Sequence, residues 1–179
     1  MLSSLGIGTV GIDPAKALIR RARDLDPQGD YRVESADAIS LSDESMDLVI
    51  AYLSLIDVPD LPSALSEVRR VLRPGGSFLI ANLQAFNTAS IGDGWGRDCF
   101  GRRRFCIDNY LQERPVITAW KGIRVTNWHR PAKAYIQGLL DEGFALRHFD
   151  EPEPQGIDDS KAERYRRVPN FVVMEWQKT

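Results

Sequence analysis

The sequence predicts an α/β fold in which a largely parallel β-sheet carries helices on its faces. Two segments, 46–53 and 77–82, are nearly continuous apolar runs, which is typical of central parallel strands. A third apolar segment, 9–13, precedes a stretch with helical spacing of its apolar residues, and another such stretch lies at 60–72. Because strands and helices alternate along the chain, a parallel sheet with flanking helices is expected.

The composition is that of an ordinary soluble globular protein. The chain has 179 residues, 43% of them hydrophobic and 27% charged, with a formal net charge of -2. This balance gives no reason to expect nucleic acid or an anionic membrane as a partner. No apolar run approaches the roughly 20 residues of a membrane span, and residues 1–5 lack the features of a signal peptide. We therefore expect a single cytoplasmic domain over residues 1–179.

The cysteines and histidines do not form a metal-binding pattern. Cys99 and Cys106 are the only cysteines, and His129 and His148 lie far from them in sequence. No metal site is predicted. A disulfide between the two cysteines stays open, although reduced thiols are expected in a cytoplasmic protein.

The first predicted strand ends on a carboxylate. Val10 and Ile12 suit a strand interior, Asp13 follows them, and Pro14 suits the first position of a helix that runs to Asp24. At the carboxyl end of a parallel strand, a carboxylate can accept hydrogen bonds from both hydroxyls of a ribose. The alternative is that Asp13 only caps the following helix.

A glycine pattern at the start of the chain does not fit a phosphate-binding loop. Gly6, Gly8 and Gly11 have the dinucleotide-binding spacing, yet that motif must follow a strand and open a helix. Only five residues precede Gly6, and Gly11 lies inside the predicted strand. Gly6 is instead expected to end a short helix over Leu2–Leu5.

The next elements complete the first half of the sheet. A short alternating strand at 31–38 ends near Asp37 and precedes the apolar strand at 46–53. A helix that starts at Asp60 has one apolar face, formed by Leu61, Leu65, Val68 and Leu72. The turn sequence at 73–76 is expected to end this helix.

The second half is predicted to contain a β-hairpin, one helix and two more strands. The expected bounds are 116–120 and 123–128 for the hairpin, 131–142 for the helix, and 144–149 and 171–176 for the strands. Two polar stretches rich in Gly, Asn, Asp or Pro, 84–101 and 151–169, are expected to be loops. The basic run at 102–104 is expected to be a solvated face.

Several of these segments resemble the class I S-adenosylmethionine-dependent methyltransferases, most closely the small-molecule enzymes of the UbiE or type 11 kind. The resemblance rests on Val10–Pro14, Ser35–Ala38, Met46–Ile50 and Glu67–Gly76, and its most specific part is the Leu-Arg-Pro-Gly-Gly sequence at 72–76. Trp120–Ile123, Trp128–Pro131 and Leu140–Phe144 are also similar to that family's substrate-side hairpin and helix. The resemblance implies a Rossmann-like methyltransferase sheet, S-adenosylmethionine as cofactor and methyl transfer to a small molecule.

The family's cofactor-binding positions match residues of this chain. Asp13 matches the acidic residue that holds the ribose hydroxyls. Asp37 matches the residue that accepts from the adenine amino group, with the Ala38 backbone N–H nearby; the alternative for Asp37 is a turn residue. Ala51, Tyr52 and Leu53 match the strand end that lies beside the methionine part of the cofactor.

The family pattern begins with a strand, a Gly-rich loop and a helix that have no counterpart before the strand at 9–13, so the sheet is expected to be truncated at its N-terminus. The absent strand belongs between the strands at 9–13 and 46–53. Those two strands can pair directly, a second copy can cover the gap, or another polypeptide can do so; we expect a homodimer. The absent loop normally contacts the methionine carboxylate, which puts binding of S-adenosylmethionine in question.

The substrate side is predicted at about 84–130, as a loop and hairpin insertion. His129 is the candidate base for a hydroxyl or ammonium acceptor, with a structural histidine as the alternative. Arg130 is a candidate for binding a substrate carboxylate, with a surface charge as the alternative. Aromatic side chains are predicted to wall the pocket, although each can instead pack in the core or the hairpin: Trp95, Tyr110, Trp120 and Trp128.

Two other function classes stay open. The first is a methyltransferase-like protein that catalyses another step, such as a cyclisation or rearrangement, in the same pocket. The second is a non-catalytic partner that dimerises through the uncovered sheet. Binding of S-adenosylmethionine, measured by calorimetry, separates methyl transfer from both.

Overall fold

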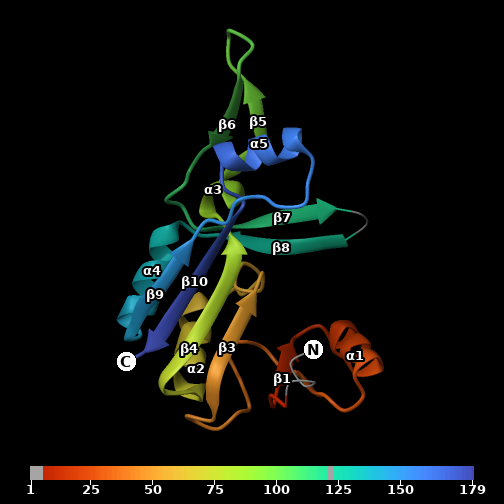
Figure 1. Ribbon diagram of the computed structural model, residues 1–179, viewed down its shortest axis with the longest axis vertical. Helices are drawn as coiled ribbons and strands as arrows, with labels where there is room; N and C mark the ends of the chain where they lie inside the picture. The colour runs from red at the N-terminus through yellow and green to blue at the C-terminus, as the bar shows by residue number, and fades with distance from the viewer. Residues whose placement is uncertain (1–5, 121–122) are drawn as a thin grey trace.

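The main sheet of the protein has four strands in the order β3-β4-β10-β9. The computed structural model describes residues 6–120 and 123–179. Strands β3 (Met46–Tyr52) and β4 (Leu72–Leu83) are parallel, and β10 (Phe171–Lys178) runs antiparallel to β4 and to β9 (Phe144–Asp150). The predicted α/β fold with a Rossmann-like sheet is therefore confirmed (Figure 1).

A second, two-stranded sheet precedes the main one. Strand β1 (Val10–Asp13) pairs in parallel with β2 (Asp30–Val33), and helix α1 (Lys16–Leu25) connects them. Strand β1 is not bonded to β3, so direct pairing of these two strands, one of the arrangements considered above, is wrong (Figure 1). The strand predicted at 31–38 ends at Val33 because the polar residues after it form a turn.

The connection at 39–44 is fixed to helix α2 (Leu61–Val71) by a partly buried network of hydrogen bonds. Glu67 accepts a hydrogen bond from the backbone N–H of Ile39 at 2.8 Å. The guanidinium of Arg70 donates to the carbonyl oxygens of Ile39 and Leu41, each at 2.7 Å, and pairs with Glu67. Because Arg70 binds two carbonyl oxygens at once, this network fixes the connection between β2 and β3 to α2.

The core lies between α2, the main sheet and helix α4 (Ala132–Asp141). Helix α2 starts as predicted, since Asp60 accepts from the backbone N–H of Ser63 at 3.1 Å. The predicted apolar face of α2 is buried, with Leu65 1% exposed. The largest fully buried side chains include Trp176, Phe78, Leu65, Leu72, Ile80 and Leu139.

The irregular start of β4 depends on two glycines. Gly75 has a φ of +78°, a conformation that other residues rarely adopt. A Cβ at Gly76 would lie 2.9 Å from the carbonyl oxygen of Arg73 and 3.2 Å from that of Asp47. Both glycines lie near the start of β4, where the register with β3 shifts, and they allow the irregular backbone of this part of the strand.

The two stretches predicted as loops contain regular elements. Residues 84–101 include helix α3 (Ala85–Thr88) and strand β5 (Ser90–Arg97), which pairs with β6 (Arg103–Ile107). Residues 151–169 include helix α5 (Asp159–Arg167), which has one buried residue, Ala162. The loop predictions were wrong because the glycines of β5 and the polarity of α5 hide the apolar periodicity.

The remaining predictions for the second half are confirmed. Strands β7 (Arg114–Trp120) and β8 (Ile123–His129) form the predicted hairpin, and Gly143, with a φ of +75°, follows α4. Helix α1 begins at Lys16, two residues later than predicted. The short helix expected at 2–5 lies outside the described residues. Among the described helices, none has the length and apolar character needed to cross a bilayer.

Candidate cofactor and substrate site

Asp13 lies at the carboxyl end of β1, half-buried, as the sequence predicted. One of its carboxylate oxygens accepts a hydrogen bond from the backbone N–H of Ala15 at 2.7 Å. The N-cap of α1 is Ala15, so Asp13 is not the cap of this helix. The interaction with Ala15 fixes the carboxylate and leaves its second oxygen for another donor.

Asp37 and Ala38 lie in an exposed turn after β2. The backbone N–H of Ala38 donates to the carbonyl oxygen of Ser35 at 3.1 Å and closes this turn. The Ala38 N–H is therefore already bonded, and the Asp37 side chain is open to solvent.

At the end of β3, one side chain is buried, the next is exposed, and the residue after them has a strained backbone. Ala51 is buried, whereas Tyr52 is 73% exposed. Leu53 has a φ of +51°, and its N–H donates to the carbonyl oxygen of Ala81 at 2.8 Å. A branched residue in the left-handed region costs on the order of 1–3 kcal/mol, and such residues cluster at ligand sites. The sequence prediction that Ala51, Tyr52 and Leu53 lie beside the methionine part of the cofactor stays a prediction.

The loop that follows β3 is held by the end of β8. The side-chain amide of Asn127 donates to Asp57 Oδ1 at 2.7 Å, and the backbone N–H of Trp128 donates to the carbonyl oxygen of Ile56 at 2.6 Å. Burial raises the pKa of Asp57, the Asn127 hydrogen bond opposes this, and the nearby negative charge of Asp13 raises it further. Asp13 belongs to the two-stranded sheet, whereas Asp57 lies in the loop after β3 of the main sheet.

Arg130, directly after β8, holds the same loop. We call the contacts of Asn127, Trp128 and Arg130 with this loop the loop clamp. Arg130 is 3% exposed, and its Nη2 donates to the carbonyl oxygens of Val58 and Pro59, each at 2.7 Å. Its Nε lies 3.5 Å from a carboxylate oxygen of Glu113, and its guanidinium lies 5.4 Å from the centre of the Trp128 ring. With its donors committed to loop carbonyls, Arg130 is neither the surface charge considered above nor free to bind a substrate carboxylate.

His129 is fully buried, and both ring nitrogens have partners. Nε2 lies 2.9 Å from the carbonyl oxygen of Tyr110, which can only accept, so Nε2 carries a hydrogen. Burial lowers the pKa of the imidazole, so the ring is neutral and Nδ1 accepts from the Thr88 hydroxyl at 2.7 Å. This geometry favours the structural alternative for His129 over the role of a base.

The predicted aromatic wall is divided between two places. The Tyr110 hydroxyl accepts from the backbone N–H of Ala132 at the start of α4, and its ring packs near His129. Trp128 lies under Arg130, in the same region. Trp95 lies apart, in the β5–β6 hairpin, 5.4 Å from Phe105 between ring centres. The Trp120 side chain is outside what the structure describes.

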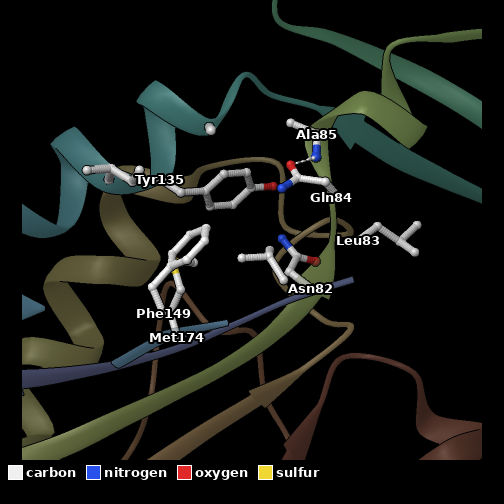
Figure 2. Close-up of a pocket in the computed structure, with 10 residues that line it drawn as sticks. Asn82, Leu83, Gln84, Ala85, Tyr135, Phe149 and Met174 are labelled. Atoms are coloured by element: carbon white, nitrogen blue, oxygen red, sulfur yellow. Dashed lines mark hydrogen bonds between the residues drawn. The ribbon is translucent and has the colours of Figure 1, made fainter. Parts of the chain in front are cut away.

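A cavity of about 80 Å³ lies between the end of β4 and helix α4 (Figure 2). Gln84 Oε1 accepts from the backbone N–H of Ala85 at 2.6 Å, the interaction drawn in Figure 2. Asn82 is 2% exposed, and its Oδ1 has no hydrogen-bond partner within the described part of the chain. Burial raises the pKa of the Tyr135 phenol, which lies on the opposite wall.

The sequence reasoning did not identify Asp57, Asn127 or Thr88. Asp57 follows the apolar strand at 46–53 by a few residues, which is a usable signal for a strand-end position. Nothing in the sequence pairs Asn127 with Asp57, because 70 positions separate them.

Known proteins similar to this chain are methyltransferases. The family model described as a methyltransferase domain (Methyltransf_11) matches residues 1–80. A malonyl-[acyl-carrier protein] O-methyltransferase from Yersinia pestis is 33% identical over 158 residues, covering 86% of this chain. A ubiquinone biosynthesis O-methyltransferase from Methylobacterium sp. is 30% identical over 99 residues, covering 51% of this chain and 40% of its own length.

A solved structure of an S-adenosylmethionine-dependent methyltransferase from Mesorhizobium loti has a TM-score of 0.81 at 29% identity, covering 94% of this chain and 80% of its own. The chain spans 58% of the length of the Yersinia pestis relative. The sequence motifs, the sheet order and these comparisons agree. The chain therefore belongs to the class I S-adenosylmethionine-dependent methyltransferases.

Proposed function

We propose that this chain is an S-adenosylmethionine-dependent methyltransferase that acts on an oxygen atom of a small molecule. The observation that carries the proposal is the Asp13 carboxylate at the carboxyl end of β1, which accepts from the Ala15 N–H at 2.7 Å and keeps its second oxygen for another donor. The carboxyl end of a parallel strand is where α/β folds bind ligands.

Asp13 would hold the ribose hydroxyls through its unengaged oxygen, and Ala51, Tyr52 and Leu53 would lie beside the methionine part. Asp37 would accept from the adenine amino group. The fixed Asp13 carboxylate and the strained Leu53 fit a bound S-adenosylmethionine. The Ala38 N–H does not fit the role expected for it, because it already donates to Ser35. S-adenosylmethionine, when bound, supplies an electrophilic methyl group.

The acceptor is best matched by a carboxylate. A carboxylate is ionised at neutral pH, so no base has to remove a proton before it attacks. This chemistry agrees with a neutral, fully buried His129 whose nitrogens are both bonded. The relatives named as malonyl-[acyl-carrier protein] O-methyltransferases support an acyl substrate attached to a carrier protein.

Calorimetry with S-adenosylmethionine tests the proposal. Asp13→Asn keeps an oxygen that can accept from Ala15 but loses the charge, so cofactor affinity should fall about tenfold or more. The matched control is Asp24→Asn, an exposed position on α1, which should leave the affinity unchanged. No binding at millimolar cofactor would contradict the proposal and favour another function for the fold.

We further propose that the protein is a homodimer. The apolar side chains of Leu48 and Ile50 on β3 are 41% and 54% exposed, and β3 is an edge strand of the main sheet. An exposed apolar edge strand is a surface that proteins usually cover. Light scattering coupled to size exclusion measures the mass, and a monomer at high concentration would contradict this proposal.

We also propose a cytoplasmic location. The thiols of Cys99 and Cys106 are both free and exposed, and such thiols persist in a reducing compartment. Fractionation of cells that produce the tagged protein tests the proposal, and recovery from an oxidising compartment would contradict it.

A further inference from the structure

The hairpin β5–β6 and helix α5 lie together beyond the carboxyl ends of β3 and β4 (Figure 1). Arg167 joins the two elements, since its Nη2 donates to the carbonyl oxygen of Arg103 at 2.8 Å. The ring of Trp95 packs against the guanidinium groups of Arg164 and Arg167, at 5.3 and 5.0 Å from its centre. The sequence separates these elements by more than fifty residues, and the fold combines them on the substrate side of the main sheet.

This assembly carries most of its charge as arginine. We call its cationic side chains the basic cluster, which consists of Arg97, Arg102, Arg103, Arg104, Lys161, Arg164, Arg166 and Arg167. Segments 97–104 and 158–167 contain only four acidic residues against these eight cations, although the whole chain has a net charge of -2. The positive charge is therefore concentrated at one end of a chain that is acidic elsewhere.

Internal ion pairs do not account for the basic cluster. Arg104 pairs with Asp98 at 3.1 Å, and Arg166 lies 3.8 Å from Glu153 with both side chains largely exposed. Within the described residues, Arg102 and Arg103 have no carboxylate at ion-pair distance. Exposed pairs contribute little, and unneutralised like charges repel, so the cluster is not explained by stability.

A basic run is usually a solvated face, yet two features distinguish this one. Seven of its eight members are arginine, whose planar guanidinium binds carboxylates and phosphates through two parallel hydrogen bonds and is weakly hydrated. In addition, Trp95 orders Arg164 and Arg167 before any partner binds, which lowers the entropy cost of association.

We propose that the basic cluster docks a small acidic carrier protein, which presents its acyl group to the site at the carboxyl ends of β1 and β3. This inference rests on the proposed function. Charge complementarity favours an acidic protein, because a carrier brings both surface carboxylates and the phosphate that attaches its acyl arm. A nucleic acid is disfavoured by the net charge of -2, since an acidic remainder would repel a long polyanion.

Direct binding tests the proposal independently of catalysis. The probe is a malonyl-loaded bacterial acyl-carrier protein with a fluorescent label, and anisotropy gives its Kd at several salt concentrations. The variant R102E/R103E should weaken binding at least about tenfold and reduce the salt dependence. The control R20E/R21E reverses two exposed charges on α1 and should bind as the wild type does.

Kinetics then link the surface to turnover. We compare kcat/KM for a malonyl thioester on the carrier with kcat/KM for a small malonyl thioester. In R102E/R103E the ratio of the first value to the second should fall at least about tenfold. An equal loss for both substrates would overturn the proposal. Unchanged anisotropy in this variant, or tighter binding of duplex DNA than of the carrier, would also overturn it. Circular dichroism melting establishes that the variant folds. Carrier binding without any cofactor binding would contradict the proposed function but not the docking surface.

Discussion

The side-chain amide of Asn127, on β8, donates a 2.7 Å hydrogen bond to the carboxylate of Asp57, in the loop after β3. This bond crosses from the β7–β8 hairpin to the loop after β3. It therefore couples the position of the hairpin to the geometry of the candidate cofactor site.

Replacing Asn127 should loosen that loop. In Asn127→Ala, Asp57 loses the side-chain donor that Asn127 supplies, and we expect a loss of about 1–3 kcal/mol in the free energy of unfolding. Cofactor affinity should fall as well. Chemical denaturation and calorimetry measure both, and Thr126→Ala, at an exposed position of the same strand, is the control.

The pH dependence of stability reports Asp57. Its pKa is raised in the folded state, so the fold binds a proton more readily than the unfolded chain, and this group makes stability fall as pH rises from about 4. In Asp57→Asn that fall should be smaller. Parallel melting curves between pH 4 and 7 check this expectation, and identical slopes would contradict it.

His129 should give the opposite slope. Burial lowers the pKa of its imidazole below the unfolded value, so stability is present above about pH 6.5 and is lost as pH falls toward the folded pKa. His129→Gln should reduce this acid sensitivity and retain methyl transfer per folded molecule. A loss of about 100-fold or more in kcat with the fold intact would instead show that His129 is the base.

Arg130→Lys tests the loop clamp. A lysine cannot reproduce the donors that reach both Val58 and Pro59, so we expect a loss of about 1–3 kcal/mol in stability. The control is Arg124→Lys, at an exposed position on β8. Equal melting temperatures for the two variants would contradict the clamp.

Gly76→Ala tests the irregular start of β4. The new methyl group would meet the carbonyl oxygens of Arg73 and Asp47, and we expect a destabilisation of about 1–3 kcal/mol. Gly8→Ala is the matched control, because its Cβ would meet nothing within 4 Å. Thermal unfolding of both variants distinguishes a steric requirement from a general cost of replacing glycine.

The sequence predicted those elements that have strong periodicity. The strand at 46–53 and the helix at 60–72 were identified because each buries one apolar side in the core. The central position expected for the strand was wrong: β3 is an edge strand of the main sheet, and Leu48 and Ile50 are exposed. Helix α5 was missed because Ala162 is its only buried residue, so its stability comes from contacts such as Trp95 with Arg164. Helical periodicity cannot report a helix that lies on the surface of a distant hairpin.

The candidate site was predictable to a similar extent. Asp13 could be placed from its strand alone, whereas the role of Arg130 depended on carbonyl oxygens in a loop more than seventy positions away. The sequence shows that position 130 is an arginine, but it does not show which carbonyl oxygens the folded chain brings to its guanidinium. For this reason the expectation for Arg130 described a surface or ligand contact, and the structure gives an internal one.

The interaction between β8 and the loop after β3 also bears on how such enzymes diversify. Asn127, Trp128 and Arg130 fix the loop next to Asp13, whereas the β5–β6 hairpin contacts helix α5 through Trp95 and Arg167. The loop next to Asp13 and the β5–β6 hairpin are therefore held by different sets of contacts, and the bond of His129 to Thr88 links the two regions. Under the proposed function, substitutions at the tip of the hairpin would change the contacts with the acceptor and leave the contacts of the loop next to Asp13 in place.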